Sequence, residues 1–349
     1  MTLIRPFRAL RPVPTRAREV IAPPYDVLSS TEARERVKGK PWSFLHVSKA
    51  EIDLPDGTDP YAQVVYATAA ENLERMRREG ILMRDANTYY YAYRVASTSG
   101  RQTGIACIAS LAAYASDRIK KHELTTPVKE TDRVKQIEAL NAQTGPVMMA
   151  YPHAPEIDRA LKRATERDPD VAVTGDDDVT HELWVLNDAA VIADLTAKFD
   201  ALPALYIADG HHRSAAAARV AVARGQVEGS HSYFLSVIFP HHEMTILDYN
   251  RVMRDLNGRT PEQLLADIAS RYSVMPSPSP VRPGGLRSRG GRRSAREPRR
   301  CERRHGRGCR ARPWPHVVIA GQRERRRRDL GSSPSARRRC GRRSARFRR

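Results

Sequence analysis

One segment decides how this chain folds: Leu205-Tyr206-Ile207-Ala208-Asp209-Gly210-His211-His212-Arg213, followed by an alanine-rich run to Arg224. Its apolar start predicts a short strand. The Asp-Gly pair predicts a tight turn, because glycine tolerates positive φ. The alanines predict a helix that ends near Gly225. The segment is therefore expected to form a strand-to-helix corner with a polar cluster at the start of the helix.

This corner is predicted to bind an anion. The first backbone N–H groups of a helix have no intrahelical acceptor and lie at the positive end of the helix dipole. The side chains of His211, His212 and Arg213 add hydrogen-bond donors at the same place. In the alternative interpretation, Asp209 and Gly210 only begin the helix, and the histidines are solvated or pack against neighbours. We favour a phosphate site.

The net charge of the chain is misleading, because it is concentrated at one end. The formal charge is +20 over 349 residues, yet residues 281–349 contain 26 arginines, no lysine and four acidic residues. Residues 1–280 are therefore nearly neutral. An arginine-rich arm could bind nucleic acid without sequence choice. The abrupt loss of lysine instead favours a coding sequence read in the wrong frame, starting between about Ser277 and Pro283. A search for strand and helix patterns in the other two reading frames would test this hypothesis.

The same composition sets the expected domain boundaries. Residues 1–280 are expected to form the folded body, with two subdomains of about 1–150 and 151–280 as one division. Residues 281–349 are expected to be disordered, because their only apolar run is Val317-Val318-Ile319-Ala320. No apolar N-terminal leader and no membrane-length apolar run is found, which favours a cytoplasmic protein.

Several common sites are missing from the sequence. Cys107 is the one cysteine before residue 280, so no disulfide framework is expected there. The phosphate loop of P-loop proteins, the Gly-x-Gly-x-x-Gly fingerprint and the His-Glu-x-x-His motif are not found. Adjacent histidines diverge by about 100° on a helix, so we predict no metal site at His211-His212. His241-His242-Glu243 is interpreted as a polar turn and Asp176-Asp177-Asp178 as a solvated loop.

Strand and helix patterns alternate along the body, so the fold class is mixed α/β, an α+β arrangement with a mixed sheet and flanking helices. Ser29 or Ser30 is expected to cap a helix through Val37, with Glu32 completing a capping box if Ser29 is the cap. The other predicted strands are 44–47, 88–93, 104–108, 147–151, 181–186, 233–240 and 246–251, and the other helices are 61–79, 131–142, 188–199 and 261–272.

A second polar segment is a candidate partner for the corner. Lys121-His122-Glu123 combines a cation, a candidate acid or base and a carboxylate at the end of a predicted strand. The structural alternative is an exposed basic strand end. Asp26, delivered by the rigid Pro23-Pro24 pair, is a weaker candidate of the same kind.

Six blocks of the sequence resemble the conserved blocks of domain-of-unknown-function family 1015. The resemblance covers about residues 3–275, and residues after about 280 do not share it. The DGHHR block also resembles the phosphate-binding motif of the wider ParB and sulfiredoxin-like group, whose members bind CTP or ATP or phosphorylate free serine. The resemblance implies a core of that kind, with its phosphate corner at Asp209, Gly210, His211, His212 and Arg213. The blocks are IAPPYDVL (21–28), FLHV (44–47), KHELT (121–125), NAQTGP (141–146), YIADGHHR (206–213) and ILDYNR (246–251).

The leading functional hypothesis is phosphoryl transfer to or from a small hydroxylated metabolite such as serine or phosphoserine, with ATP or ADP and Mg²⁺. Phosphoryl transfer needs mainly positioning and charge neutralisation. Arg213 and the amides near Gly210 would bind phosphate, with Lys121 contributing to the cofactor site. His211 or His212 would stabilise transferred charge, and Glu123 or Asp209 would act as base or metal ligand.

Two alternatives remain open. A ParB-like nucleotide-dependent DNA-binding or regulatory protein would need a basic surface and a helix-turn-helix, and residues 1–280 show neither convincingly, so nucleic acid is not expected to bind the body. A truncated, inactive product is the other alternative, because loss of a C-terminal part could expose apolar surface.

Overall fold

The computed structural model describes residues 2–98, 100–225, 228–244, 255–277 and 316–320. The chain divides into two compact units, Met1–Thr245 and Ile246–Arg349. The expected boundary near residue 150 falls within a strand of the first unit, Val147–Tyr151.

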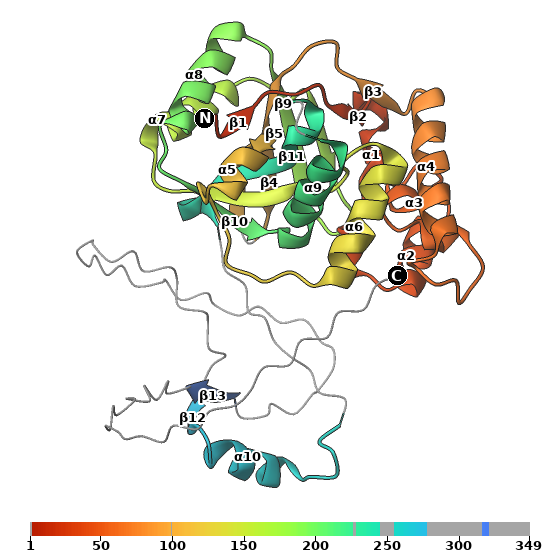
Figure 1. Ribbon diagram of the computed structural model, residues 1–349, viewed down its shortest axis with the longest axis vertical. Helices are drawn as coiled ribbons and strands as arrows, with labels where there is room; N and C mark the ends of the chain where they lie inside the picture. Colours follow the sequence, from red (N-terminus) through yellow and green to blue (C-terminus); the bar gives the residue numbers. More distant parts are fainter. Residues whose placement is uncertain (1, 99, 226–227, 245–254, 278–315, 321–349) are drawn as a thin grey trace, which may run out of the picture. The chain divides into compact units, whose positions relative to one another are not determined.

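Among the described residues, nine strands form one mixed sheet in the first unit (Figure 1). Its strands are β1 (Ile4–Arg5), β4 (Tyr90–Ser97), β5 (Gly100–Ser110), β6 (Ile119–Lys120), β7 (Val147–Tyr151), β8 (Val171–Thr174), β9 (Thr180–Leu186), β10 (Leu205–Asp209) and β11 (Tyr233–Pro240). They run in the order β6-β10-β7-β11-β5-β4-β9-β8, and β1 pairs with β5. The pairs β6/β10 and β7/β11 are parallel. The mixed α/β prediction is thus confirmed.

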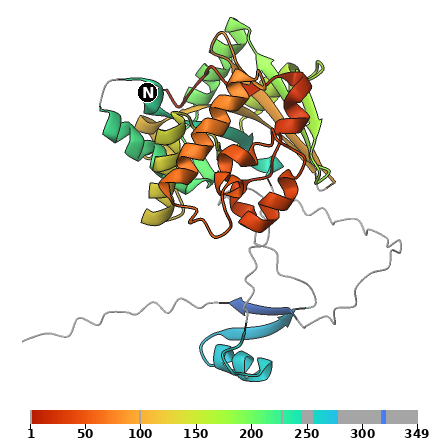
Figure 2. The same cartoon turned by 90° about the vertical axis from the view of Figure 1, so that its right-hand side faces the viewer.

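The helices of this unit are α1 (Ala17–Val20), α2 (Ser30–Val37), α3 (Leu45–Ser48), α4 (Gln63–Arg78), α5 (Leu111–Ala115), α6 (Pro127–Leu140), α7 (Pro155–Ala164), α8 (Ala189–Asp200) and α9 (His211–Arg224). Figure 1 shows α6 beside α9, and α9 also contacts β7 and β11. Figure 2 shows the red-to-orange N-terminal helices in front of the strands. A separate pair of strands, β2 (Leu10–Pro12) and β3 (Leu82–Arg84), is antiparallel.

Two apolar clusters hold these layers together. The larger joins the sheet to α7, α8 and α9, with Trp184, Phe199 and Phe234 fully buried. The second lies around α4 and includes Val47, Leu73 and Leu140 from α3, α4 and α6. Burial of apolar surface in these clusters is the main force that fixes the position of α6 and α9.

Most predicted elements are confirmed, and several boundaries move. The helix α2 begins after Ser29, whose hydroxyl accepts from the Glu32 amide while the Glu32 carboxylate accepts from the Ser29 amide, so the capping box is present. The predicted helix at 131 begins four residues earlier, because Pro127 occupies its first turn, where a missing N–H costs nothing.

The prediction of a strand at 44–47 is wrong. This segment is the single helical turn α3, with Leu45 and Val47 both buried. A four-residue apolar run does not distinguish a strand from a buried helical turn, and packing decided the outcome here.

In the second unit, the described residues form the helix α10 (Pro261–Ala269) and the strands β12 (Ser273–Ser277) and β13 (His316–Ala320). The strands β12 and β13 pair antiparallel, and β13 contains the apolar run of the predicted tail. The rest of that tail, and the strand predicted at 246–251, lie outside the described residues. In the described part of the chain, no helix is both long and apolar enough to cross a membrane.

Candidate functional site

The strand-to-helix corner forms as the sequence predicts. β10 ends at Asp209, Gly210 has φ 99° and ψ 27°, and α9 begins at His211. A Cβ on Gly210 would lie 3.3 Å from the Val147 Cα and 3.5 Å from the Arg213 Nη1. Glycine is therefore required both for the left-handed backbone and for the close approach of β7.

The start of α9 offers free donors. The amides of Arg213 and Ser214 donate to the Gly210 carbonyl, at 2.9 and 3.1 Å. Within the described part of the chain, the amides of His211 and His212 donate to no other residue. Such amides at the positive end of a helix can hold an anion.

His211 is the most buried polar group of the corner, with 2% of its side chain exposed. Its Nε2 accepts from the His122 amide at 3.3 Å, so the neutral ring carries its proton on Nδ1. That Nδ1 lies 3.4 Å from the Glu123 Oε2 but makes no hydrogen bond within the described residues. Burial, and then the nearby His122, lower the pKa of His211 against the opposite pull of Glu123 and Asp209. The ring is therefore neutral near pH 7 and has an unused donor.

His212, like His211, accepts a hydrogen bond from a backbone amide. Its Nε2 accepts from the Thr126 amide at 3.1 Å. The two histidines together fix the segment 122–126 against the start of α9. The sequence predicted that both rings donate to a ligand. In the structure, the Nε2 atom of each ring accepts a hydrogen bond from a backbone amide, so the Nδ1 atom is the one that can donate.

Arg213 is the centre of the corner. Its Nη1 donates to the Pro146 carbonyl at 2.9 Å and to the Asp209 carboxylate at 3.4 Å, and its Nη2 donates to the Asp26 carboxylate at 3.2 Å. Burial disfavours the charged form, but the nearby Tyr25, Asp209 and Asp26 outweigh it and raise the pKa of Arg213. The guanidinium is thus held in one position by groups from three segments of the chain.

Sequence reasoning ranked one of these segments too low. The turn Tyr25–Val27, after Pro23 and Pro24, brings Asp26 to Arg213, and the Tyr25 ring lies 5.8 Å from the Arg213 guanidinium and 4.3 Å from that of Arg133. Arg133 was missed, because nothing distinguishes it from the other charges of its helix. The IAPPYDVL block was the available signal for Tyr25.

The segment at 145–146 was also missed as part of the site. A Cβ on Gly145 would lie 3.3 Å from the Cδ and Nε of Arg213, and the Pro146 carbonyl is an acceptor for the same side chain. In the sequence, this stretch was named only as part of the NAQTGP block. In the structure, it leaves room for the Arg213 side chain beside Gly145 and accepts a hydrogen bond from it at Pro146.

Of the other two predicted site residues, Glu123 lies at the corner and Lys121 points elsewhere. Glu123 lies next to His211, as noted, and is exposed. The Lys121 ammonium instead donates to the Tyr114 carbonyl at 3.1 Å and lies 4.2 Å from the Tyr114 ring. Lys121 thus contacts Tyr114 in this arrangement, and its part in the cofactor site stays a prediction. Asp176 pairs with Lys40 and Asp177 accepts from the Val179 amide, as expected for a loop.

The charge balance of the corner constrains its ligand. One guanidinium faces the carboxylates of Asp26 and Asp209, and a third carboxylate, Glu123, lies beside the neutral His211. A bare phosphate would meet donors and carboxylates together, and like charges repel. An anion that carries a divalent cation matches both the donors and the carboxylates, because carboxylate oxygens are preferred Mg²⁺ ligands.

Comparison with known proteins identifies the family of the chain and gives no function for it. The model of the family described as "Protein of unknown function (DUF1015)" matches residues 4–322. The match extends beyond residue 275, where the resemblance was expected to end, and includes β13. No curated protein and no solved structure matches the chain.

Proposed function

The chain belongs to the DUF1015 family, and we propose that its corner at Asp209–Arg213 binds a phosphate-bearing small molecule with Mg²⁺ and transfers a phosphoryl group. The donor or acceptor nucleotide would be ATP or ADP. The second substrate would be a small hydroxylated metabolite such as serine or phosphoserine. We expect the reaction in the cytoplasm, where nucleotide and Mg²⁺ are available.

The observation that carries the proposal is a set of unused donors at one place. The Nδ1 of His211 is buried without a hydrogen bond, and the amides of His211 and His212 at the start of the same helix are free among the described residues. A buried donor without a partner is costly, by about 1–3 kcal/mol, unless a ligand or water satisfies it. A phosphate oxygen is a suitable acceptor for all three.

The corner contains donors suited to the phosphate of a Mg²⁺-phosphate and carboxylates suited to its Mg²⁺. The helix amides, His211 and Arg213 would bind phosphate oxygens. Asp26 and Asp209, whose side chains are 48% and 67% exposed, have oxygens that would hold Mg²⁺. Bound Mg²⁺ would neutralise phosphate charge, which is the main electrostatic need of phosphoryl transfer.

Proton transfer requires a base near the hydroxyl substrate. Glu123 is exposed beside His211, so its carboxylate would accept the hydroxyl proton while the neutral imidazole donates to the transferred group. A relation to the ParB and sulfiredoxin-like group would fit this proposal. Its support is the DGHHR block alone.

The test is a binding panel on the full chain. Thermal shift and calorimetry would be run with ATP, ADP, serine, phosphoserine and inorganic phosphate, each with and without Mg²⁺. The variants are R213A and, as a matched control on the same helix, R219A, whose side chain is 46% exposed and pairs with Glu130.

We expect Mg²⁺-nucleotide binding that R219A preserves and R213A weakens by about 100-fold, the cost of losing charge-assisted hydrogen bonds. Binding that does not depend on Mg²⁺ would contradict the division of charges. No binding of any compound, or equal loss in both variants, would overturn the proposal. Salt-sensitive binding of DNA by the body would favour the ParB-like alternative instead.

A further inference from the structure

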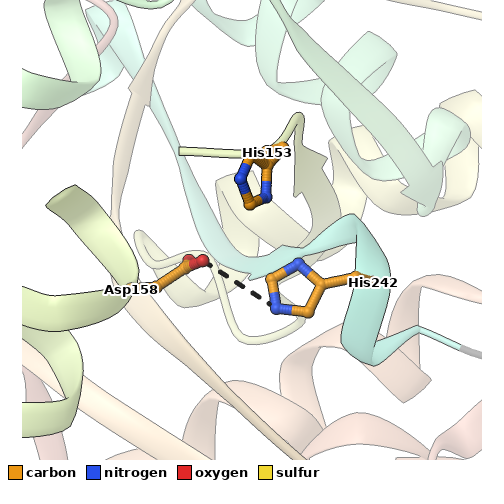
Figure 3. A group of neighbouring side chains, drawn as sticks. All are labelled: His153, Asp158 and His242. Carbon is orange, nitrogen blue, oxygen red and sulfur yellow. Dashed lines mark ion pairs between the residues drawn. The ribbon is translucent and has the colours of Figure 1, made fainter. Parts of the chain in front are cut away.

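At the other end of β7 lies a second cluster of ligating side chains, His153, Asp158 and His242 (Figure 3). We propose that this cluster binds a divalent transition-metal ion, with Zn²⁺ as the best match. The inference is independent of the function proposed for the corner. Gly210 packs on Val147 at the start of β7, whereas His153 follows Tyr151 at its end.

The sheet topology brings these residues together. β7 and β11 are parallel neighbours, and Tyr151 is paired in register with Pro240. His153 and His242 are each two residues beyond that pair, so they leave the same edge of the sheet side by side. Asp158 lies in the first turns of α7, which begins at Pro155. The cluster is thus fixed by strand register and by one short helix.

The ligand atoms already approach one another. One atom from each of the three side chains lies within 4.8 Å of the other two. The Asp158 Oδ2 and the His242 Nε2 are 3.8 Å apart. Figure 3 shows both imidazoles and the carboxylate around a common space. Zn²⁺ bonds of about 2.0–2.2 Å require ligand atoms roughly 3.3 Å apart, and the two exposed histidines have the freedom to close this gap.

A neighbouring tyrosine orients the carboxylate. The buried Tyr151 hydroxyl donates to the Asp158 Oδ1 at 2.6 Å, which leaves Oδ2 for the cluster. Such a hydrogen bond to a ligating carboxylate is typical of metal sites.

The donor set identifies the ion. Two imidazoles and one carboxylate suit Zn²⁺ and its transition-metal neighbours, whereas Mg²⁺ and Ca²⁺ prefer oxygen ligands alone. Three protein ligands leave a coordination position for water, which is the arrangement of an open site rather than a closed structural one. His241, next along the chain, has its ring 5.6 Å from that of His242 and is outside the ligand group.

The experiment measures Zn²⁺ affinity of the full chain after removal of metal with a chelator. Cys301, Cys309 and Cys340 are replaced by serine throughout, because thiolates would compete for Zn²⁺. Zn²⁺ is titrated against a chromophoric competitor for the parent and for H153A, D158N, H242A and Y151F. The controls are H241A and R213A, and circular dichroism verifies that each variant is folded.

We expect one Zn²⁺ per chain with micromolar or tighter affinity, unaffected by millimolar Mg²⁺. H153A, D158N and H242A should each weaken binding by about 100-fold or more, and Y151F by about tenfold, as expected for an outer-shell partner. H241A and R213A should bind as the parent does. No Zn²⁺ binding by the parent would overturn the proposal and leave Asp158 and His242 as a plain ion pair. Equal affinity in folded H153A and H242A would overturn it as well.

Discussion

The two ends of β7 contain polar groups that are held in opposite ways. At its start, Arg213 is bound by a carbonyl and two carboxylates, and the rings of His211 and His212 are fixed by backbone amides. At its end, His153 and His242 are exposed, and the Asp158 Oδ2 and the His242 Nε2 are 3.8 Å apart. The side chains of the first arrangement are held in place before a ligand arrives, whereas those of the second need an ion to draw them together.

The stability of the two sites therefore has different sources. A preorganised network contributes to folding by itself and loses little entropy when a ligand binds. A loose group of exposed side chains contributes little until its ligand is present, and then its binding energy becomes folding energy. Stability measured without ligand therefore separates the two ends of the strand.

The largest effect is expected for R213A without any ligand. The substitution removes the bonds to Pro146, Asp209 and Asp26 and the packing of the side chain on Gly145. We expect a loss of about 2–3 kcal/mol in the free energy of unfolding, measured by urea denaturation. R219A removes an exposed ion pair on the same helix and should lower the free energy of unfolding by less than about 1 kcal/mol. Equal costs would mean that the Arg213 network does not stabilise the corner.

The next effect is expected for G210A. Alanine at φ 99° is strained, and its Cβ would press on the backbone of Val147 at 3.3 Å. We expect a loss of about 1–2 kcal/mol, together with weaker nucleotide binding because the helix amides shift. Gly39 is a matched control, since it also has positive φ, 71°, but open space around it. G39A should cost about 1 kcal/mol or less and leave binding unchanged, so a nucleotide affinity of G210A equal to that of the parent would show that the amides do not hold the ligand.

The sequence predicted the corner because the causes of its fold are local. An apolar run, an Asp-Gly pair and an alanine-rich stretch each act through neighbouring residues, and so does the Ser29–Glu32 capping box. The partners of Arg213 are not local, since Asp26 is 187 residues away in the chain. Chain folding sets such a contact, and no spacing in the sequence predicts it.

The second cluster illustrates the same limit more strongly. His153 and His242 meet only because β7 and β11 are parallel neighbours in register, which follows from the strand order of the whole sheet. A polar turn was predicted at His241-His242-Glu243, and it is confirmed as the 3₁₀ segment His241–Glu243. The residue that completes the cluster, Asp158, had no recognisable pattern.

The buried histidine of the corner predicts a pH dependence. The pKa of His211 is lowered in the folded state, chiefly by burial, so the unfolded chain binds a proton first as pH falls through about 6.5. The free energy of unfolding should therefore decrease from pH 7 toward pH 5. The pKa of His181 is lowered by burial in the same way and contributes in the same direction.

Urea denaturation at a series of pH values measures this slope in the parent, H211Q and H181Q. H211Q should reduce the slope, because glutamine has no proton to gain, and H181Q should reduce it by a separate amount. An H211Q chain with the same slope as the parent would show that folding does not lower the pKa of His211.

The smallest effect is expected for H242A in the presence of a chelator. Its pair with Asp158 is long and its side chain is 45% exposed, so the free energy of unfolding should change by less than about 0.5 kcal/mol. With free Zn²⁺ at about 100 times Kd, the parent should gain about 2.7 kcal/mol and H242A almost nothing. R213A should show the reverse, with its full loss in chelator and a normal gain with Zn²⁺. A large loss for H242A in chelator would mean that the cluster is preorganised as the corner is, and that the contrast between the two ends of β7 does not hold.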